Sequence, residues 1–253
     1  MISGTKTMTD FAFLHGGGQG SWVWDETIAA MQAQSGGAAR CLALDVPGCG
    51  SKRGRDTSAT GFADIARELI TDIEAADMRD VVLVGHSQAG TIMPLMAEFA
   101  PSGLIRKLIF VSCTAPEQGK SMIEQMGKGL HGENEDEVGW PVDTATTSRE
   151  DRHPAMFCND MDRLAAESFL AKLGKDKWPP SSYFQREWQF EHLAAFPSSY
   201  VLCLQDMTLP PAWQERFALQ LHCDRTVKID AGHQVMNTRP QGLAEILLAA
   251  AAG

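Results

Sequence analysis

Clusters of basic residues are absent from this chain of 253 residues, which has 22 Lys and Arg against 32 Asp and Glu and a net charge of −10. Proteins that bind nucleic acid or an anionic membrane surface usually present a basic patch, so we expect neither as a partner. No apolar run approaches the ~20 residues of a membrane-spanning helix. The first ten residues also lack the basic and apolar regions of a signal peptide. These absences predict a cytoplasmic protein that does not bind membranes.

Patterns that usually signal metal or cofactor binding are missing as well. Six cysteines occur without a C-x-x-C pair, and several lie in apolar runs, which is typical of buried free thiols in a reducing compartment. A glycine-rich loop at 15–21 lacks the G-K-[ST] of a P-loop and the G-x-G-x-x-G of a dinucleotide site. We therefore expect no metal and no cofactor. Four histidines show neither H-x-x-x-H nor H-E-x-x-H spacing: His131, His153, His192 and His222.

Short apolar runs alternate with amphipathic stretches along most of the chain. Because strand-helix-strand units close as parallel pairs, this alternation predicts an α/β fold with a mostly parallel central sheet and helices on both faces. The length suits one large domain. The expected strands cover residues 11–14, 40–45, 81–84, 104–112, 199–204 and 226–229, and the expected helices cover 22–34, 61–76, 91–99, a stretch beginning at Pro210 and Pro211, and 242–251.

The alternation breaks between residues 113 and 196. This stretch has prolines, glycines, an acidic run at 133–137 and short helical patches such as 161–173, and it is rich in aromatic residues and methionine. A long insertion with its own helices often covers a site. We expect a core formed by 1–112 and 197–253 with a helical lid at 113–196. A packed helical subdomain without substrate contact is the alternative.

The segment 81–90 combines a strand, a tight turn and a helix. Four apolar residues lead into Gly85-His86-Ser87-Gln88-Ala89-Gly90, and the stretch after Gly90 has a helical pattern. This is the context of a nucleophile elbow, in which the serine hydroxyl is exposed on a strained turn and its neighbours must be small. An ordinary strand-to-helix turn is the alternative. The context favours Ser87 as a nucleophile.

Asp206 and His233 also follow predicted strands. The carboxyl ends of parallel strands meet at one edge of the sheet, where active sites are built. A serine needs a base to remove its proton, and a carboxylate keeps that base in the correct tautomer. The order Ser87, Asp206, His233 is that of the α/β-hydrolase triad. Asp206 as a simple helix cap and Asp230 as the acid remain alternatives, and His86 is a weak candidate for the base because neighbours at an elbow point different ways.

These motifs resemble the compact branch of the α/β-hydrolases that contains plant methylesterases and hydroxynitrile lyases, and more closely their bacterial esterase-like relatives. The resemblance covers nearly the whole chain, from 13–22 and 45–50 through the Ser87 turn to 205–210 and Gly232-His233. It implies that the backbone N–H groups of Gly17 and Gln88 form an oxyanion hole. Residues 157–160 also resemble a lid segment of the bacterial members.

Departures from the family pattern favour a hydrolase over a lyase. The lyases have a Thr in the first loop, near Gly17, an altered residue at the position of His86, and often a Lys at the position of Gln234. Gln19 stands where plant methylesterases often have His.

The sequence therefore predicts a serine hydrolase of small apolar or aromatic esters, a methyl ester among them, acting through an acyl-enzyme. Lyase, carbon–carbon hydrolase, cofactor-free oxygenase and slow-turnover receptor activities are the alternatives, and a homodimer is one of the open oligomeric states. Further substrate contacts are expected from the first loop, the elbow and the lid: His15, Gly16, Gly18, His86, Trp140, Phe157, Trp188 and Met207.

Overall fold

The computed structural model describes residues 8–252. Its centre is a sheet of six strands in the order β2-β1-β3-β4-β5-β6, and every neighbouring pair is parallel. The predicted parallel α/β fold is therefore confirmed. The strands are β1 (Thr9–Leu14), β2 (Ala39–Leu44), β3 (Val81–His86), β4 (Ile105–Val111), β5 (Ser198–Cys203) and β6 (Arg225–Ile229).

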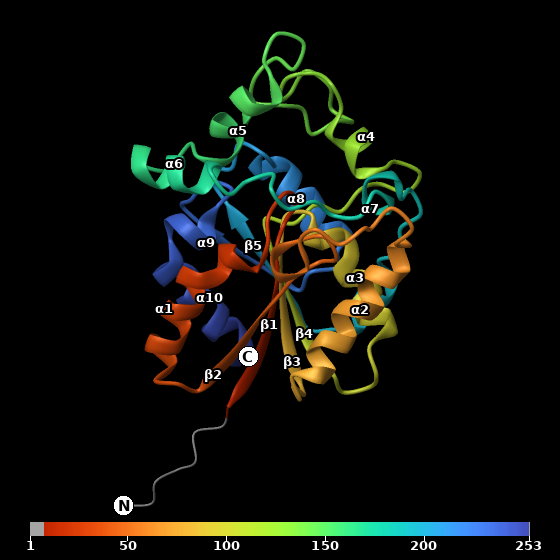
Figure 1. The fold of residues 1–253 in the computed structure, drawn as a ribbon, viewed down its shortest axis with the longest axis vertical. Coiled ribbons are helices and arrows are strands. Elements are labelled where there is room, and N and C mark those ends of the chain that lie inside the picture. The colour runs from red at the N-terminus through yellow and green to blue at the C-terminus, as the bar shows by residue number, and fades with distance from the viewer. Residues whose placement is uncertain (1–7, 253) are drawn as a thin grey trace, which may run out of the picture.

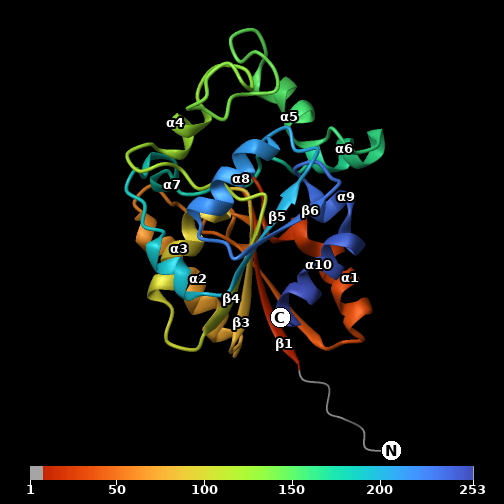
Figure 2. The ribbon, with the colours of Figure 1, turned by 180° about the vertical axis from the view of Figure 1, so that it is seen from behind.

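Helices cover both faces of this sheet (Figures 1 and 2). On one face lie α1 (Asp25–Ser35) and α10 (Pro240–Ala252), which pack against each other, and on the other lie α2 (Phe62–Ala75) and α3 (Ala89–Phe99). The expected single helix over 22–34 is instead a 3-10 turn, η1 (Ser21–Trp24), followed by α1. Ser21 makes no helix cap, because its backbone N–H and its hydroxyl both donate to Asp45.

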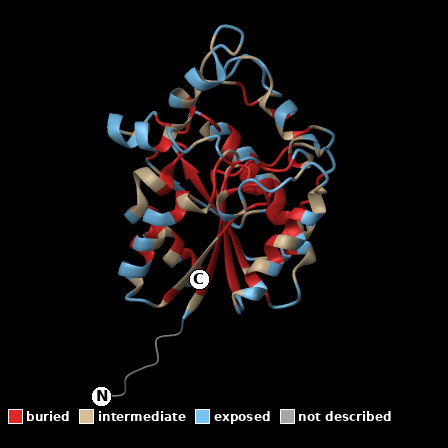
Figure 3. Ribbon diagram, viewed as in Figure 1, coloured by how far each residue is buried: buried red, intermediate tan, exposed pale blue. Residues whose placement is uncertain are grey.

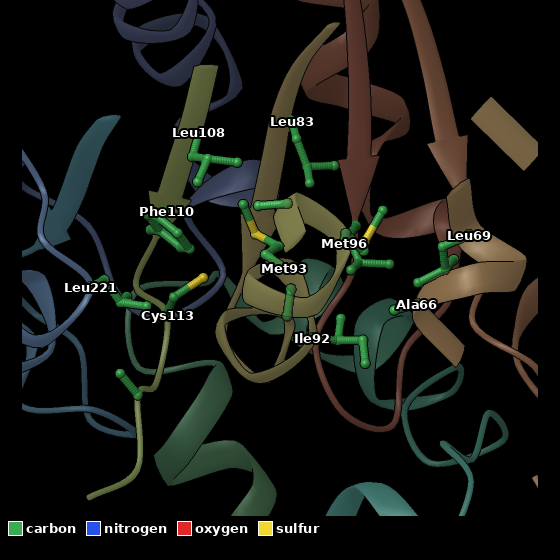
Figure 4. Packing of buried hydrophobic residues seen from close by; sticks show 14 of the residues in the cluster. Ala66, Leu69, Leu83, Ile92, Met93, Met96, Leu108, Phe110, Cys113 and Leu221 are labelled. Carbon is green, nitrogen blue, oxygen red and sulfur yellow. The ribbon is translucent and has the colours of Figure 1, made fainter. Parts of the chain in front are cut away.

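The central strands are buried on both faces, which explains their continuous apolar sequence. In β3, Val82 and Val84 pack into the cluster under α1 and α10, whereas Leu83 packs into the cluster under α2 and α3. Figure 4 shows part of the second cluster, where Met93 and Met96 of α3 lie between the sheet and Leu69 of α2. Burial is concentrated in the sheet and the inner helix faces (Figure 3). This packing fixes the strand ends, and with them the residues that follow each strand.

Residues 113–196, called the insertion below, connect β4 to β5. They include α4 (Met122–Met126), α5 (Arg149–Phe157), α6 (Arg163–Leu170), α7 (Ser181–Phe184) and the 3-10 helix η3 (Glu191–Ala195). Helices α4, α5 and α6 lie at the top of the molecule in Figure 1. The helix expected at 161–173 is shorter, because Asp162 accepts a hydrogen bond from Ala165 and caps α6.

The chain returns to the core through β5. Helix α8 (Pro211–Gln220) follows it and begins with proline at its first position, as predicted. The short helix α9 (Val235–Thr238) comes directly after the loop that carries His233. Within residues 8–252 no helix is long and apolar enough to cross a bilayer.

Candidate active site

Ser87 lies on the turn between β3 and α3 with a φ of 55°, in the left-handed region. Few non-glycine residues adopt this conformation, and it is a recognised form of strain at active sites. The neighbours must be small: a Cβ on Gly85 would lie 2.2 Å from Met93 Sδ, and one on Gly90 would lie 2.2 Å from the Thr114 carbonyl oxygen. Ala89 is accommodated because Gly85, which faces it, has no side chain.

The structure brings Ser87, His233 and Asp206 together in one chain of hydrogen bonds. His233 Nε2 lies 3.0 Å from Ser87 Oγ, and His233 Nδ1 lies 2.7 Å from Asp206 Oδ2. His233 and Asp206 are buried and Ser87 is half-buried. With Nδ1–H donating to the carboxylate, Nε2 is left as the atom that can take a proton from the serine.

Asp206 has further donors that fix its orientation. Its Oδ1 accepts hydrogen bonds from the backbone N–H groups of Thr208 and Leu209, at 2.7 and 2.8 Å. Its Oδ2 accepts from Ser112 Oγ and, at 3.3 Å, from Gln214 Nε2. The carboxylate thus stabilises the turn before α8 and also contacts His233. It does not cap α8, whose N-cap residue is Pro210 and has no side-chain cap.

Ser112 was not identified from the sequence as a site residue. It follows β4 with a φ of 41°, and its hydroxyl also lies 3.3 Å from His233 Nδ1. Its position at the end of an expected strand, 104–112, is the only signal that the sequence offers. The competing acid, Asp230, is exposed and accepts a hydrogen bond from Gln205 Nε2 at 2.6 Å, so it is not the partner of His233.

His86 is buried behind the turn and does not line the cavity in front of Ser87. Its Nε2 lies 2.9 Å from the backbone oxygen of His233 and donates to it, and the two rings are 4.6 Å apart between centroids. Burial holds the pKa of His86 well below its usual value. The imidazole is therefore neutral and supports the backbone of the His233 loop.

His15 supports the glycine-rich loop in a similar way. Its Nε2 accepts from the Val46 N–H at 3.3 Å, so Nδ1 carries the proton and donates to the Gly16 oxygen at 2.9 Å. Burial lowers the pKa of His15. A Cβ on Gly16 would lie 2.8 Å from Ser87 Cβ, so glycine here permits the close approach of the loop to Ser87. His15 and Gly16 lie behind the cavity surface and do not line it.

Gly17 and Gln88 line the cavity together with Ser87. Within residues 8–252, neither of their backbone N–H groups donates a hydrogen bond to another protein group. The Gln88 side chain is held by its Nε2, which donates to Ser182 Oγ at 3.1 Å, and its Oε1 would clash with any Cβ on Gly17. Two adjacent free donors beside a serine are what an oxyanion hole requires.

A cavity of about 180 Å³ opens in front of Ser87. Gly18, Trp140 and Phe157, which the sequence proposes as substrate contacts, line it. Arg149, His153, Tyr183 and Thr208 contribute polar side chains, and the apolar remainder comes mainly from the insertion: Met122, Met126, Met156, Leu173 and Leu209.

Two predicted contacts lie elsewhere. Trp188 packs against Phe62 and Phe190 and donates its indole N–H to the Lys120 carbonyl oxygen at 2.8 Å, so it belongs to the core rather than to the cavity. Met207 is 37% exposed and does not line the cavity either. The cavity lining therefore gives no support to the predicted substrate contacts of these two residues, or to those of the buried His15, Gly16 and His86.

Two other features of the described residues, 8–252, bear on binding. No group of three or more His, Cys, Asp or Glu is arranged to hold a metal ion there. A larger cavity of about 390 Å³ lies between η1, α6 and α9, and it includes none of Ser87, Asp206 and His233.

Comparison with known proteins shows that the chain belongs to the alpha/beta hydrolase family, whose model matches residues 11–246. It is 26% identical over 257 residues to the carbendazim hydrolyzing esterase of Nocardioides sp. (strain SG-4G), covering 96% of this chain and 99% of that protein. A pyrethroid hydrolase structure from Sphingobium faniae JZ-2 matches with a TM-score of 0.75 at 22% identity, covering 98% of both chains. A methylesterase structure from Arabidopsis matches with a TM-score of 0.72 at 17% identity, covering 97% of this chain and 99% of that one. The resemblance noted in the sequence is thus confirmed at the level of the family.

Proposed function

We propose that this α/β-hydrolase is a serine carboxylesterase with Ser87, His233 and Asp206 as its catalytic triad. The observation that carries the proposal is the hydrogen-bond chain from Ser87 Oγ through His233 to Asp206, which opens onto the cavity. The esterase and methylesterase names of its relatives by sequence support the same reaction class.

In the proposed reaction, Ser87 Oγ attacks the ester carbonyl carbon while His233 Nε2 takes the hydroxyl proton. Asp206 stabilises the imidazolium that forms. Collapse of the tetrahedral intermediate breaks the bond to the alcohol, which leaves with the proton from His233. Water then attacks the acyl-enzyme with His233 again as the base, and this step releases the acid and restores Ser87.

We assign the oxyanion hole to the backbone N–H groups of Gly17 and Gln88. Both are free to donate within the described chain and both adjoin Ser87 at the cavity. Each such donor contributes roughly 3 kcal/mol of transition-state stabilisation when its geometry is right.

The cavity supports a small apolar or aromatic acyl group. Its volume of about 180 Å³ is small beside the ~300–1,000 Å³ of pockets that hold drug-sized ligands. Methionine and aromatic side chains form much of its wall, and most of them belong to the insertion, which we propose acts as the lid of a core made by 1–112 and 197–253. Faster hydrolysis of long-chain or charged esters would contradict this substrate class.

We also propose a cytoplasmic location. All six cysteines are free, and burial raises the pKa of the Cys113 and Cys203 thiols well above the usual value. Unpaired, buried thiols suit a reducing compartment.

The test is hydrolysis of p-nitrophenyl acetate and butyrate by the wild type, by Ser87→Ala and by a matched control, Ser168→Ala. Ser168 is an exposed serine of α6, outside the cavity that contains Ser87. The proposal predicts that Ser87→Ala lowers kcat by on the order of 10⁴ or more while Ser168→Ala keeps wild-type activity. A folded wild type that hydrolyses no ester, or a Ser87→Ala variant that stays active, would overturn the proposal.

A further inference from the structure

One short segment of the insertion touches both the loop that carries Asp206 and the loop that carries His233. The segment comprises residues 156–160, the end of α5 and the turn after it, and is called the strap here. Asn159 Nδ2 donates to the Gln205 carbonyl oxygen at 2.8 Å, and Asp160 Oδ2 accepts from the Gly232 N–H at 2.9 Å. Gln205 and Gly232 are the residues directly before Asp206 and His233 in the sequence. The strap therefore holds the backbone on the N-terminal side of both residues.

Two more contacts connect the strap to the same place. Thr208 Oγ1 donates to the Met156 carbonyl oxygen at 2.8 Å, and the Thr208 N–H donates to Asp206 itself. The ring of Phe157 lies 5.7 Å from the His233 ring between centroids. More than twenty residues of sequence separate the two loops, and the strap contacts both.

Asp160 is an unusual residue to bury for structural reasons alone. Its side chain is only 3% exposed, and its ion pair with Arg239 is long, at 3.7 Å between Nη1 and Oδ2. Its Oδ1 is buried without a hydrogen-bond partner within residues 8–252. Burying a carboxylate with incomplete compensation costs stability. Within residues 8–252, the hydrogen bond that Asp160 accepts comes from the Gly232 N–H, beside His233.

Gly232 shows how closely the strap fits this loop. A Cβ at Gly232 would lie 2.4 Å from Asp160 Oδ1 and 2.7 Å from Asn159 Oδ1. Its φ lies outside the left-handed region, so the backbone conformation itself does not require glycine. Glycine is needed there because the strap packs directly on the loop of the base.

We propose that Asn159 and Asp160 are positioning residues, which hold the Asp206 and His233 loops so that His233 stays within hydrogen-bond distance of Ser87. This inference rests on the proposed esterase function and assigns the strap a role in it. Displacing a catalytic group by about 1 Å can cost on the order of 100-fold in rate. If Asn159 and Asp160 only anchored the insertion, replacing them would instead change the stability of the protein or its binding of substrate.

The experiment compares Asp160→Ala, Asn159→Ala and Asp160→Asn with a matched control, Asp162→Ala. Asp162 lies two residues further on and caps α6 without touching either loop. Positioning predicts that Asp160→Ala and Asn159→Ala lower kcat for p-nitrophenyl acetate by about 10- to 100-fold, with KM within twofold of wild type. Asp160→Asn retains a side-chain oxygen for the Gly232 N–H and restores part of the loss. Asp162→Ala keeps kcat, although it lowers the melting temperature.

A second measurement does not depend on turnover. The proton that His233 shares with Asp206 should give a low-field NMR resonance, which Asp160→Ala shifts or broadens and Asp162→Ala leaves in place. If Ser87→Ala abolishes activity but Asp160→Ala leaves kcat and this resonance unchanged, the positioning role is overturned and the esterase proposal stands. An equal loss of kcat in Asp162→Ala also overturns it. If the wild type hydrolyses no ester, the esterase proposal fails and the resonance alone decides the positioning role.

Discussion

Replacing Asp206 by asparagine tests the proposed role of the carboxylate more sharply than removing it. The Asn carbonyl can take the place of Oδ1 and accept from Thr208 and Leu209, as Asp206 does now. The amide NH₂ then occupies the position of Oδ2, where it faces Nδ1 of His233. His233 must accept that hydrogen bond at Nδ1, which moves its own proton to Nε2. A protonated Nε2 cannot take the proton of Ser87.

The expected cost is a fall in kcat of about 10⁴-fold, or roughly 5.5 kcal/mol of transition-state stabilisation. KM should change little, because Asp206 does not line the cavity. The assay is steady-state hydrolysis of p-nitrophenyl acetate, with a circular dichroism melt to show that the variant is folded.

The matched control is Asp230→Asn. Asp230 was the competing acid in the sequence, and in the structure it accepts a hydrogen bond only from the exposed Gln205 side chain among its described contacts. It should retain wild-type activity. If Asp230→Asn lost activity while Asp206→Asn stayed within tenfold of wild type, the assignment of the acid would be refuted.

Three further predictions concern the surroundings of the site. Burial lowers the folded-state pKa of His15 and His86 below 6.5. The free energy of unfolding should therefore be highest above that pH and fall as pH falls, by up to about 1.4 kcal/mol per pH unit for each histidine, because only the unfolded chain then takes up the protons. Urea unfolding at pH 7.5 and 5.5 should show this loss, and equal free energies of unfolding would contradict it. Ser112→Ala removes a buried hydrogen-bond donor to the Asp206 carboxylate and should lower kcat/KM about tenfold. An unchanged kcat/KM would contradict this and show that the other donors to Asp206 hold it in place. Trp188→Ala should lower the free energy of unfolding by about 3–5 kcal/mol and leave KM unchanged, whereas Trp140→Ala should raise KM; a raised KM in Trp188→Ala would place that residue at the substrate after all.

The fold could be predicted from the sequence because, in the core, the pattern of apolar residues along each strand and helix matches the faces that are buried in the structure. β3 is apolar at every position from 81 to 84 since both of its faces are buried, and α2 shows helical spacing since only one of its faces is. The same logic placed Ser87, Asp206 and His233 near one another, because each follows a strand of a parallel sheet.

The insertion gave poorer predictions for a physical reason. Its helices have four to nine residues, which is too short for a period to define a buried face. Trp140 and Trp188 are both aromatic residues of this region, yet one lines the cavity and the other packs on Phe62. Tertiary contacts alone decide between these positions. Ser112 was missed for a related reason, since its role depends on how β4 and β5 are placed side by side.

Proximity in the sequence was also a poor guide to the chemistry of the histidines. His86 adjoins Ser87 along the chain, but its ring lies on the far side of the turn, between Trp24 and His233. The proposed mechanism requires His233 to become positively charged for a moment. A second imidazolium whose ring centroid is 4.6 Å away would oppose that charge. Burial keeps His86 neutral, so it can donate a hydrogen bond to the His233 backbone without competing for the proton. In the proposed mechanism, the neutral His86 thus supports the role of His233 as the base.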